Sequence, residues 1–129
     1  MTLRGRRDTG QAAVELVLVL PFLMALLLLV VQVGLVVRAQ VLVTNAAREA
    51  ARAAAVDPDP GAAARAATAS TTLDPQRLTT KVRSRGAPGE PVVVEVSYRA
   101  PTDVALVGSL LPDVALTAVA VMRVEGEQG

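Results

Sequence analysis

The longest apolar stretch of the chain runs from Leu16 to Val37 and contains no charged residue. Only Pro21, Gln32 and Gly34 interrupt these 22 residues. A helix rises 1.5 Å per residue, so this stretch would be about 33 Å long and would cross a hydrocarbon core of roughly 30 Å. The pattern therefore predicts a single transmembrane helix near the N-terminus.

Polar residues return after this stretch, but the helical pattern continues. In "RAQVLVTNAAREAARAAAV" small and apolar residues recur every three or four positions and predict an apolar stripe of Val37, Val41, Thr44, Ala47, Ala51 and Ala55. Two interpretations stay open: a solvated helix, because alanine has the best helix propensity, or small side chains that let a neighbouring helix approach closely. One helix is predicted over residues 11–56, ending at the two prolines of "DPDPG".

The period of the pattern changes in the second half of the chain, after a short alanine-rich helix expected at Ala62–Ser70. Alternating side chains predict a hairpin of strands Leu78–Arg85 and Pro91–Arg99, joined by the turn residues of "GAPGE". On the first strand Leu78, Thr80, Val82 and Ser84 should share a face; on the second, Val92, Val94, Val96 and Tyr98. A third strand is expected at Val114–Glu125, after the apolar connection "PTDVALVGSLLP", although its weak alternation leaves a helix open.

These elements predict an α+β fold that is anchored in a membrane: a long N-terminal helix that continues outside the bilayer, followed by a small antiparallel sheet of about three strands. Three regions are expected, namely a cytoplasmic leader at 1–10, the transmembrane and extended helix at 11–56, and a small extracytoplasmic domain at 57–129. Arg4, Arg6 and Arg7 precede the span, and positive residues beside a first span stay in the cytoplasm. Everything after Arg38 should therefore lie outside the cytoplasm.

Composition narrows the possible functions. The net charge is +1, which offers no strongly basic surface, so no nucleic-acid partner is expected. The chain has no cysteine and no histidine, and its four serines do not occur in a G-x-S-x-G context. We therefore expect no catalytic residue, no metal or other cofactor and no small-molecule substrate. A small domain without disulfides needs support from the long helix or from a partner, which favours a role in assembly.

One short segment points to a family. "GQAAVE", Gly10 to Glu15, comes before an apolar helix and resembles the processing site of type IV prepilins, where a basic leader ends in glycine and glutamate is the fifth residue after the cut. The wider run "GQAAVELVLVLPFLMALLLLVVQVG…NAAREAARAAA" is similar to the TadE-like family, the pseudopilins of the tight-adherence (Flp) pilus system. The resemblance covers about residues 5–55.

The resemblance implies a pilin-like fold and specific roles for four residues. A prepilin-type peptidase of the membrane would cut between Gly10 and Gln11. Glu15 would neutralise the new N-terminal amine of an adjacent subunit, and Pro21 would kink the span for packing in a filament. The implied partners are the membrane, this peptidase, other pilins and pseudopilins, and Tad assembly proteins. The implied location is the bacterial cytoplasmic membrane, with incorporation into the pilus as a further possibility.

Other interpretations remain for these residues. Glu15 also suits an interfacial position in the first turn of a helix, where a carboxylate costs little, and membrane helices commonly tolerate proline. Leu16 stands where major pilins of this system have an aromatic residue, and the exported domain is longer than theirs, so a minor pseudopilin is expected. Two rivals are a secretory signal peptide cut after Ala39 and a single-span anchor for a small binding protein unrelated to pili.

Overall fold

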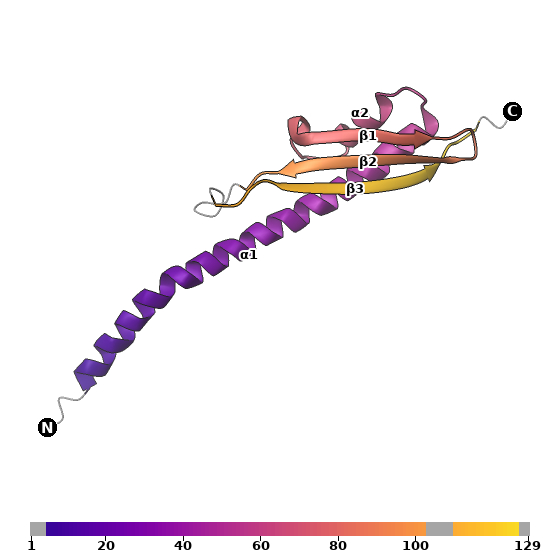
Figure 1. Cartoon of the computed structure of the whole chain (residues 1–129). Coiled ribbons are helices and arrows are strands. Elements are labelled where there is room, and N and C mark those ends of the chain that lie inside the picture. Colours follow the sequence, from indigo (N-terminus) through magenta and orange to yellow (C-terminus); the bar gives the residue numbers. More distant parts are fainter. Residues whose placement is uncertain (1–4, 103–109, 127–129) are drawn as a thin grey trace.

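The computed structural model describes residues 5–102 and 110–126 and consists of one long helix with a small sheet packed against its C-terminal part (Figure 1). The elements follow the order α1, α2, η1, β1, β2 and β3. Their bounds are α1 Gly5–Val56, α2 Ala62–Ala69, η1 Pro75–Arg77, β1 Leu78–Arg85, β2 Pro91–Ala100 and β3 Val114–Arg123. The expected α+β fold is confirmed.

Helix α1 has 52 residues and is therefore about 78 Å long. It begins at Gly5, before the expected start at residue 11, and it ends at Val56 as expected. Pro58 and Pro60 follow this end, and the carboxylate of Asp57 accepts a hydrogen bond of 2.8 Å from the backbone amide of Asp59. The prolines and this local bond replace the helical backbone pattern and turn the chain into α2.

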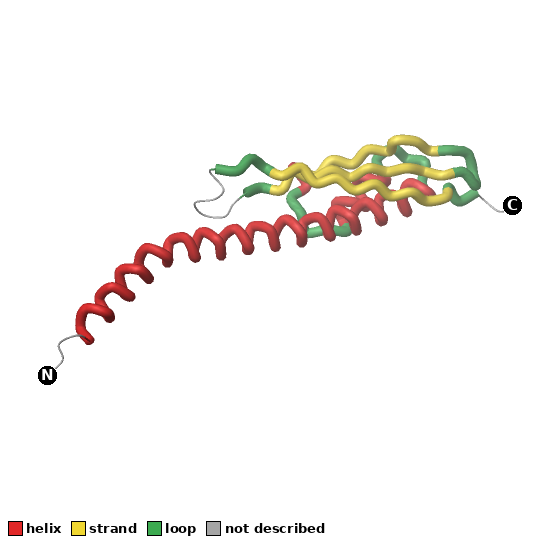
Figure 2. Tube along the Cα trace, turned by 60° about the horizontal axis from the view of Figure 1, so that its bottom comes forward, coloured by secondary structure: helices red, strands yellow, loops and turns green. Residues whose placement is uncertain are grey.

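The three strands form one antiparallel sheet in the order β1-β2-β3. The C-terminal part of α1 lies along one face of this sheet, and α2 packs beside α1 (Figures 1 and 2). Val92, Val94, Val96 and Tyr98 of the central strand face α1 and are buried, as the alternation predicted. We call the sheet, η1, α2 and the α1 residues packed against them the head.

The alanines of α1 form the other half of this core. Ala46, Ala47, Ala50, Ala51, Ala54 and Ala55 are all less than 5% exposed, and Val43 is fully buried. The expected stripe was wrong at Val37 and Val41, which are more than half exposed. Of the two open interpretations, close approach of a neighbour is confirmed, and the neighbours are the chain's own sheet and α2.

The first strand departs from its expected alternation. Lys81 pairs with Glu95, but the register shifts between Val82 and Ser84, so Ser84 lies opposite Val93 and Arg85 lies opposite Val92. Ser84 was expected to share the face of Leu78, but it lies on the opposite face of the sheet. This bulge turns Arg85 to the helix side, where its Nη1 donates hydrogen bonds of 2.6 Å to the Ala54 carbonyl and 2.7 Å to the Asp57 carbonyl. Arg85 thus caps the C-terminus of α1.

Candidate functional site: the exposed part of α1 and the base of the head

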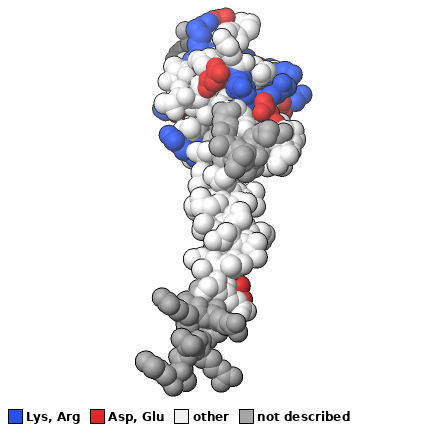
Figure 3. Space-filling model, turned by 90° about the vertical axis from the view of Figure 1, so that its left-hand side faces the viewer, with Lys and Arg blue, Asp and Glu red and all other residues white. Residues whose placement is uncertain are grey.

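The N-terminal part of α1 presents its side chains to the outside. From Gly10 to Val31 every residue except the half-buried Leu28 is exposed, and most are large and apolar. Figure 3 shows this part as a stalk without charge over most of its length. The most apolar window has a mean hydropathy of 2.9, and α1 is the one described helix that is long and apolar enough to cross a membrane. A helix that is apolar on all sides suits lipid as its surroundings.

Gly10 and Gln11 lie on this exposed helix, not in a turn. A Cβ added at Gly10 would meet nothing within 4 Å, and the glycine with a positive φ in the described chain is Gly89 in the hairpin turn. Neither crowding nor backbone conformation therefore explains a glycine at position 10. Within a helix, glycine costs about 0.5–1 kcal/mol relative to alanine, so the fold alone would favour another residue there.

Glu15 is also exposed, one turn after Gln11 on the same helix. Its neighbours Val14 and Leu16 are 61% and 62% exposed. Among the side chains that the structure describes, no basic group forms an ion pair with Glu15. The carboxylate therefore stands in an apolar surface, where a cation from outside the described chain could reach it.

Pro21 lies inside α1, six residues beyond Glu15. Proline lacks the amide hydrogen that would bond to the carbonyl of residue 17. The helix is visibly curved, and its N-terminal part bends away from the line of the part under the sheet (Figures 1 and 2). Missing helical hydrogen bonds are one of the usual causes of such bending.

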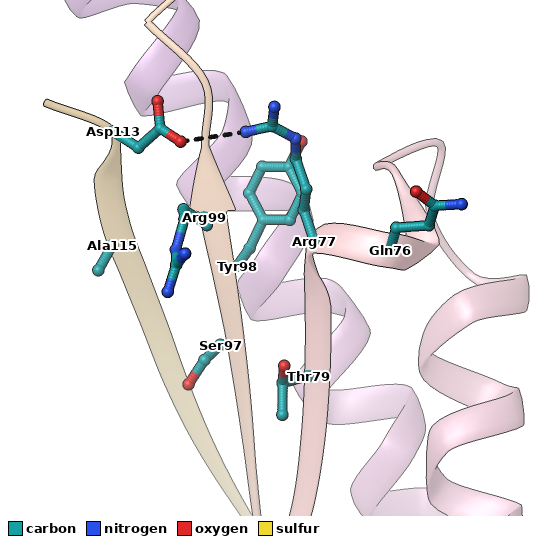
Figure 4. Close-up of a pocket in the computed structure, with 8 residues that line it drawn as sticks. All are labelled: Gln76, Arg77, Thr79, Ser97, Tyr98, Arg99, Asp113 and Ala115. Atoms are coloured by element: carbon teal, nitrogen blue, oxygen red, sulfur yellow. Dashed lines mark hydrogen bonds and ion pairs between the residues drawn. The ribbon is translucent and has the colours of Figure 1, made fainter.

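The sheet ends nearest to the exposed part of α1 at what we call the base of the head: Ala100–Thr102, Leu110–Val114 and η1. A hollow of about 460 Å³ lies here on the sheet face turned away from α1 (Figure 4). Arg77 and Asp113 form an ion pair of 3.2 Å across its rim, and Arg99 and Ser97 line it. Sequence analysis did not single out this hollow, because its residues come from three separate segments.

The polar groups in and near the hollow form two pairs, Ser97 with Thr117 and Arg77 with Asp113. In the described ranges, no three His, Cys, Asp or Glu side chains gather closely enough to hold a metal ion. Ser97 Oγ lies 3.4 Å from Thr117 Oγ1, and among the described residues neither hydroxyl is hydrogen-bonded to a group that would act as a general base. The charged pair at the rim is partly exposed, as are most structural ion pairs.

Comparison with known proteins finds a family match within the long helix. Residues 10–52 match the family model for TadE-like proteins. No curated protein and no solved structure matches the chain. The family relates the chain to the tight-adherence pilus, and its members are typically structural. The matched segment starts at Gly10 and lies entirely within α1. Residues 10–52 are thus a TadE-like segment, which confirms the resemblance seen in "GQAAVELVLVLP" and "AAREAAR".

Proposed function

We propose that the protein is a minor pseudopilin that takes part in the assembly of a tight-adherence pilus. The N-terminal part of α1 would span the cytoplasmic membrane, with the leader inside and the head outside. A prepilin-type peptidase would remove residues 1–10 and leave Gln11 as the new N-terminus. Other pilins or pseudopilins and Tad assembly proteins would then be its partners.

The observation that carries this proposal is where the TadE-like match falls. The match begins at Gly10, the residue before the proposed cut, and continues through the exposed apolar helix. The glycine meets no packing or backbone requirement of the described fold. A peptidase that holds extended backbone closely would supply that requirement, because only glycine lacks a Cβ.

Glu15 fits the same proposal on electrostatic grounds. A lone carboxylate in apolar surroundings is costly, and a cation brought by a neighbouring subunit reduces that cost. The free amine of Gln11 on an adjacent subunit would be such a cation, created by the cut itself. Pairing between Glu15 and that amine would also fix how far one helix can slide along the next. A bend at Pro21 would let the exposed helices follow one another in a filament.

The structure of the head supports a minor subunit more than the main filament subunit. A sheet of three strands and a second helix form a folded unit outside the exposed helix. In addition, position 16 is a leucine, whereas the major pilins of the tight-adherence system have an aromatic residue there. The three arginines before the span support the inside position of the leader.

N-terminal sequencing of the protein extracted from membranes tests the proposal directly. We expect the sequence to begin at Gln11. A chain that begins at Gln40 would instead have been cut as a signal peptide, and a chain that begins at Met1 or Thr2 would be a plain membrane anchor. Either of the last two results would contradict processing at Gly10. An alkaline phosphatase fused after Ala100 should be active if the head lies outside the cytoplasm.

A further inference from the structure

The contact between α1 and the rest of the head begins within the apolar run, before the run ends at Val37. Gln32, which lies within Leu16–Val37, is only 5% exposed, and Leu28 and Val36 are half-buried. An apolar groove of about 400 Å³ separates this part of the helix from the base of the head. Leu29, Val33 and Val37 line one side of the groove, and Leu111, Pro112 and Val114 line the other. The base of the head therefore stands beside the last turns of the expected span.

The length of the helix places this contact relative to the bilayer. The full apolar run of 22 residues is about 33 Å long, close to the thickness of a hydrocarbon core. The part that precedes Gln32, the first buried residue of the run, is Leu16–Val31, which has 16 residues and is about 24 Å long, several Å shorter than the hydrocarbon core is thick. If the head stood clear of the bilayer, Glu15 would be drawn into the hydrocarbon, which is unfavourable.

The side chains at the base suit the alternative, in which the head touches the bilayer. Leu110 is 82% exposed and Leu111 is 45% exposed, and Val33 and Val37 on the adjoining helix are also more than half exposed. Leu111, Val33 and Val37 line the same groove, and with the exposed neighbour Leu110 these four residues continue the apolar surface of the span onto the head. We call them the apolar rim.

Two exposed arginines lie at the same end of the molecule. Arg38 follows the apolar run directly and is exposed, and Arg99 is exposed where the base begins. Figure 3, which views this end, shows basic side chains on both sides of the head above the stalk, with acidic side chains among them on one side. The one acidic side chain that lines the nearby hollow, Asp113, is paired with Arg77. Guanidinium groups bind phosphate oxygens well, so Arg38 and Arg99 suit phospholipid headgroups.

Gln32 shows how closely the head covers the last turns of the apolar run. The groove of Val33 and Leu111 lies on one side of Gln32, and a second hollow lined by Tyr98 and Pro101 lies on the other. The side chain is only 5% exposed, and its Oε1 accepts no hydrogen bond from the described residues. The head therefore occupies the level of the helix at which the expected span ends.

From these observations we propose that the base of the head is seated in the outer surface of the bilayer. The apolar rim would enter the boundary between headgroups and hydrocarbon, and Arg38 and Arg99 would bind lipid phosphates. The partner of this surface is the phospholipid membrane. The proposal rests on membrane anchoring by α1, which is part of the proposed function, but it does not depend on cleavage at Gly10 or on a pilus.

Fluorescent labelling at single cysteines tests the proposal, because the native chain has no cysteine to remove. The full chain would be reconstituted in vesicles of phosphatidylcholine and phosphatidylglycerol, with the dye NBD on Leu110→Cys, Ala87→Cys or Leu23→Cys. Ala87 lies in the exposed hairpin turn at the far end of the head, and Leu23 lies in the span. Lipids with a nitroxide near the headgroup and iodide in the water would serve as the two quenchers.

We expect the dye at position 110 to emit at shorter wavelength and to be quenched several-fold more by nitroxide lipids than the dye at position 87. Iodide should quench position 87 well and position 110 poorly. Equal iodide quenching at 110 and 87, while position 23 remains lipid-quenched, would overturn the seating and leave the anchoring intact. Protection at 110 from both quenchers would mean that protein, such as a second copy, covers the rim, and would also overturn it. Iodide access at position 23 would overturn the anchoring itself, and the seating with it.

The arginines can be tested separately in the same system. In Arg38→Gln/Arg99→Gln the lipid quenching at position 110 should fall several-fold and lose its dependence on phosphatidylglycerol. The matched variant Lys81→Gln/Arg123→Gln removes two exposed charges from the strands and should change nothing. Equal behaviour of the two double variants would contradict the role of Arg38 and Arg99.

Discussion

Helix α1 is one continuous element with two contrasting halves. From Gly10 to Val31 its side chains are mostly large and apolar and face outward; from Ala39 to Ala55 the core positions are mostly alanine and face the sheet and α2. In the first half the large apolar side chains suit apolar surroundings outside the chain, such as lipid. In the second half the small size of the side chains lets the chain's own elements approach closely. Burial, more than helical propensity, distinguishes the halves.

This comparison makes opposite predictions for the two halves. Substitutions in the first half should change processing and assembly and leave the stability of the head unchanged. Substitutions at the buried positions of the second half should do the reverse.

The largest effect is expected for Gly10→Val, which adds a branched side chain at the proposed cut. The protein should insert normally but keep its ten-residue leader completely, because a peptidase that needs close backbone contact would be blocked. Gel mobility and N-terminal sequencing would show this. Gly34→Val is the matched control, since an added Cβ there also meets nothing within 4 Å, and it should be processed normally. Normal mobility of Gly10→Val would mean that no cut occurs there.

Glu15→Gln should have the next largest effect. The amide keeps the size of the side chain but removes its charge, so the protein should insert and be cut, yet lose co-purification with pilus components. Glu15→Ala should behave in the same way. Glu49→Gln, which neutralises an exposed carboxylate in the second half of the same helix, is the control. Normal assembly of both Glu15 variants would make Glu15 an ordinary interfacial residue.

In the second half, Ala50→Leu should destabilise the head by about 2–3 kcal/mol, because Ala50 is fully buried and the added atoms would force the sheet away from the helix. Urea unfolding in detergent would measure this, with the fluorescence of Tyr98, the one tyrosine of the chain, as the probe. Ala64→Leu, on the exposed side of α2, is the same substitution without crowding and should change stability little. Processing at Gly10 should be unaffected in both.

The smallest effect is expected for Arg85→Leu, which removes the cap of α1. The carbonyls of Ala54 and Asp57 would lose their guanidinium donor, and partial access of water should limit the loss to about 1 kcal/mol. The same unfolding experiment would detect it. Lys81→Gln on the same strand is the charge-matched control. A stability equal to that of the wild type would show that water replaces the guanidinium fully.

Much of the fold follows from local patterns in the sequence. The three strands, the hairpin turn and the end of α1 were predicted because alternation, glycine and proline act over a few neighbouring residues. The buried face of α1 was predicted correctly at Ala47, Ala51 and Ala55 but not at Val37 and Val41. Apolar residues surround the helix near these two valines, so the position of the sheet, and not the sequence pattern, determines which side is buried. The bulge at Val82 and Ser84 also escaped prediction, because it depends on pairing with the next strand.

The candidate sites divide in the same way. Gly10 and Glu15 were found through a resemblance to a family, and both lie on the exposed surface of α1. The base of the head was not predicted, because the groove joins Gln32 of the helix to residues that follow it by 70 positions or more, from Thr102 to Val114. No periodic pattern within one segment could signal that meeting.

The path of α1 has a mechanical consequence. The helix does not stop where the head begins but runs under the sheet to its far end, where the amide of Glu125 donates a 3.0 Å hydrogen bond to the carbonyl of Ala55 (Figure 1). A tension between the membrane and the far end of the head is therefore carried along the covalent backbone of one helix. The strands, which lie beside this line, share the load only through their lateral contacts with α1. A pulling force along α1 would therefore place little load on the hydrogen bonds between the strands.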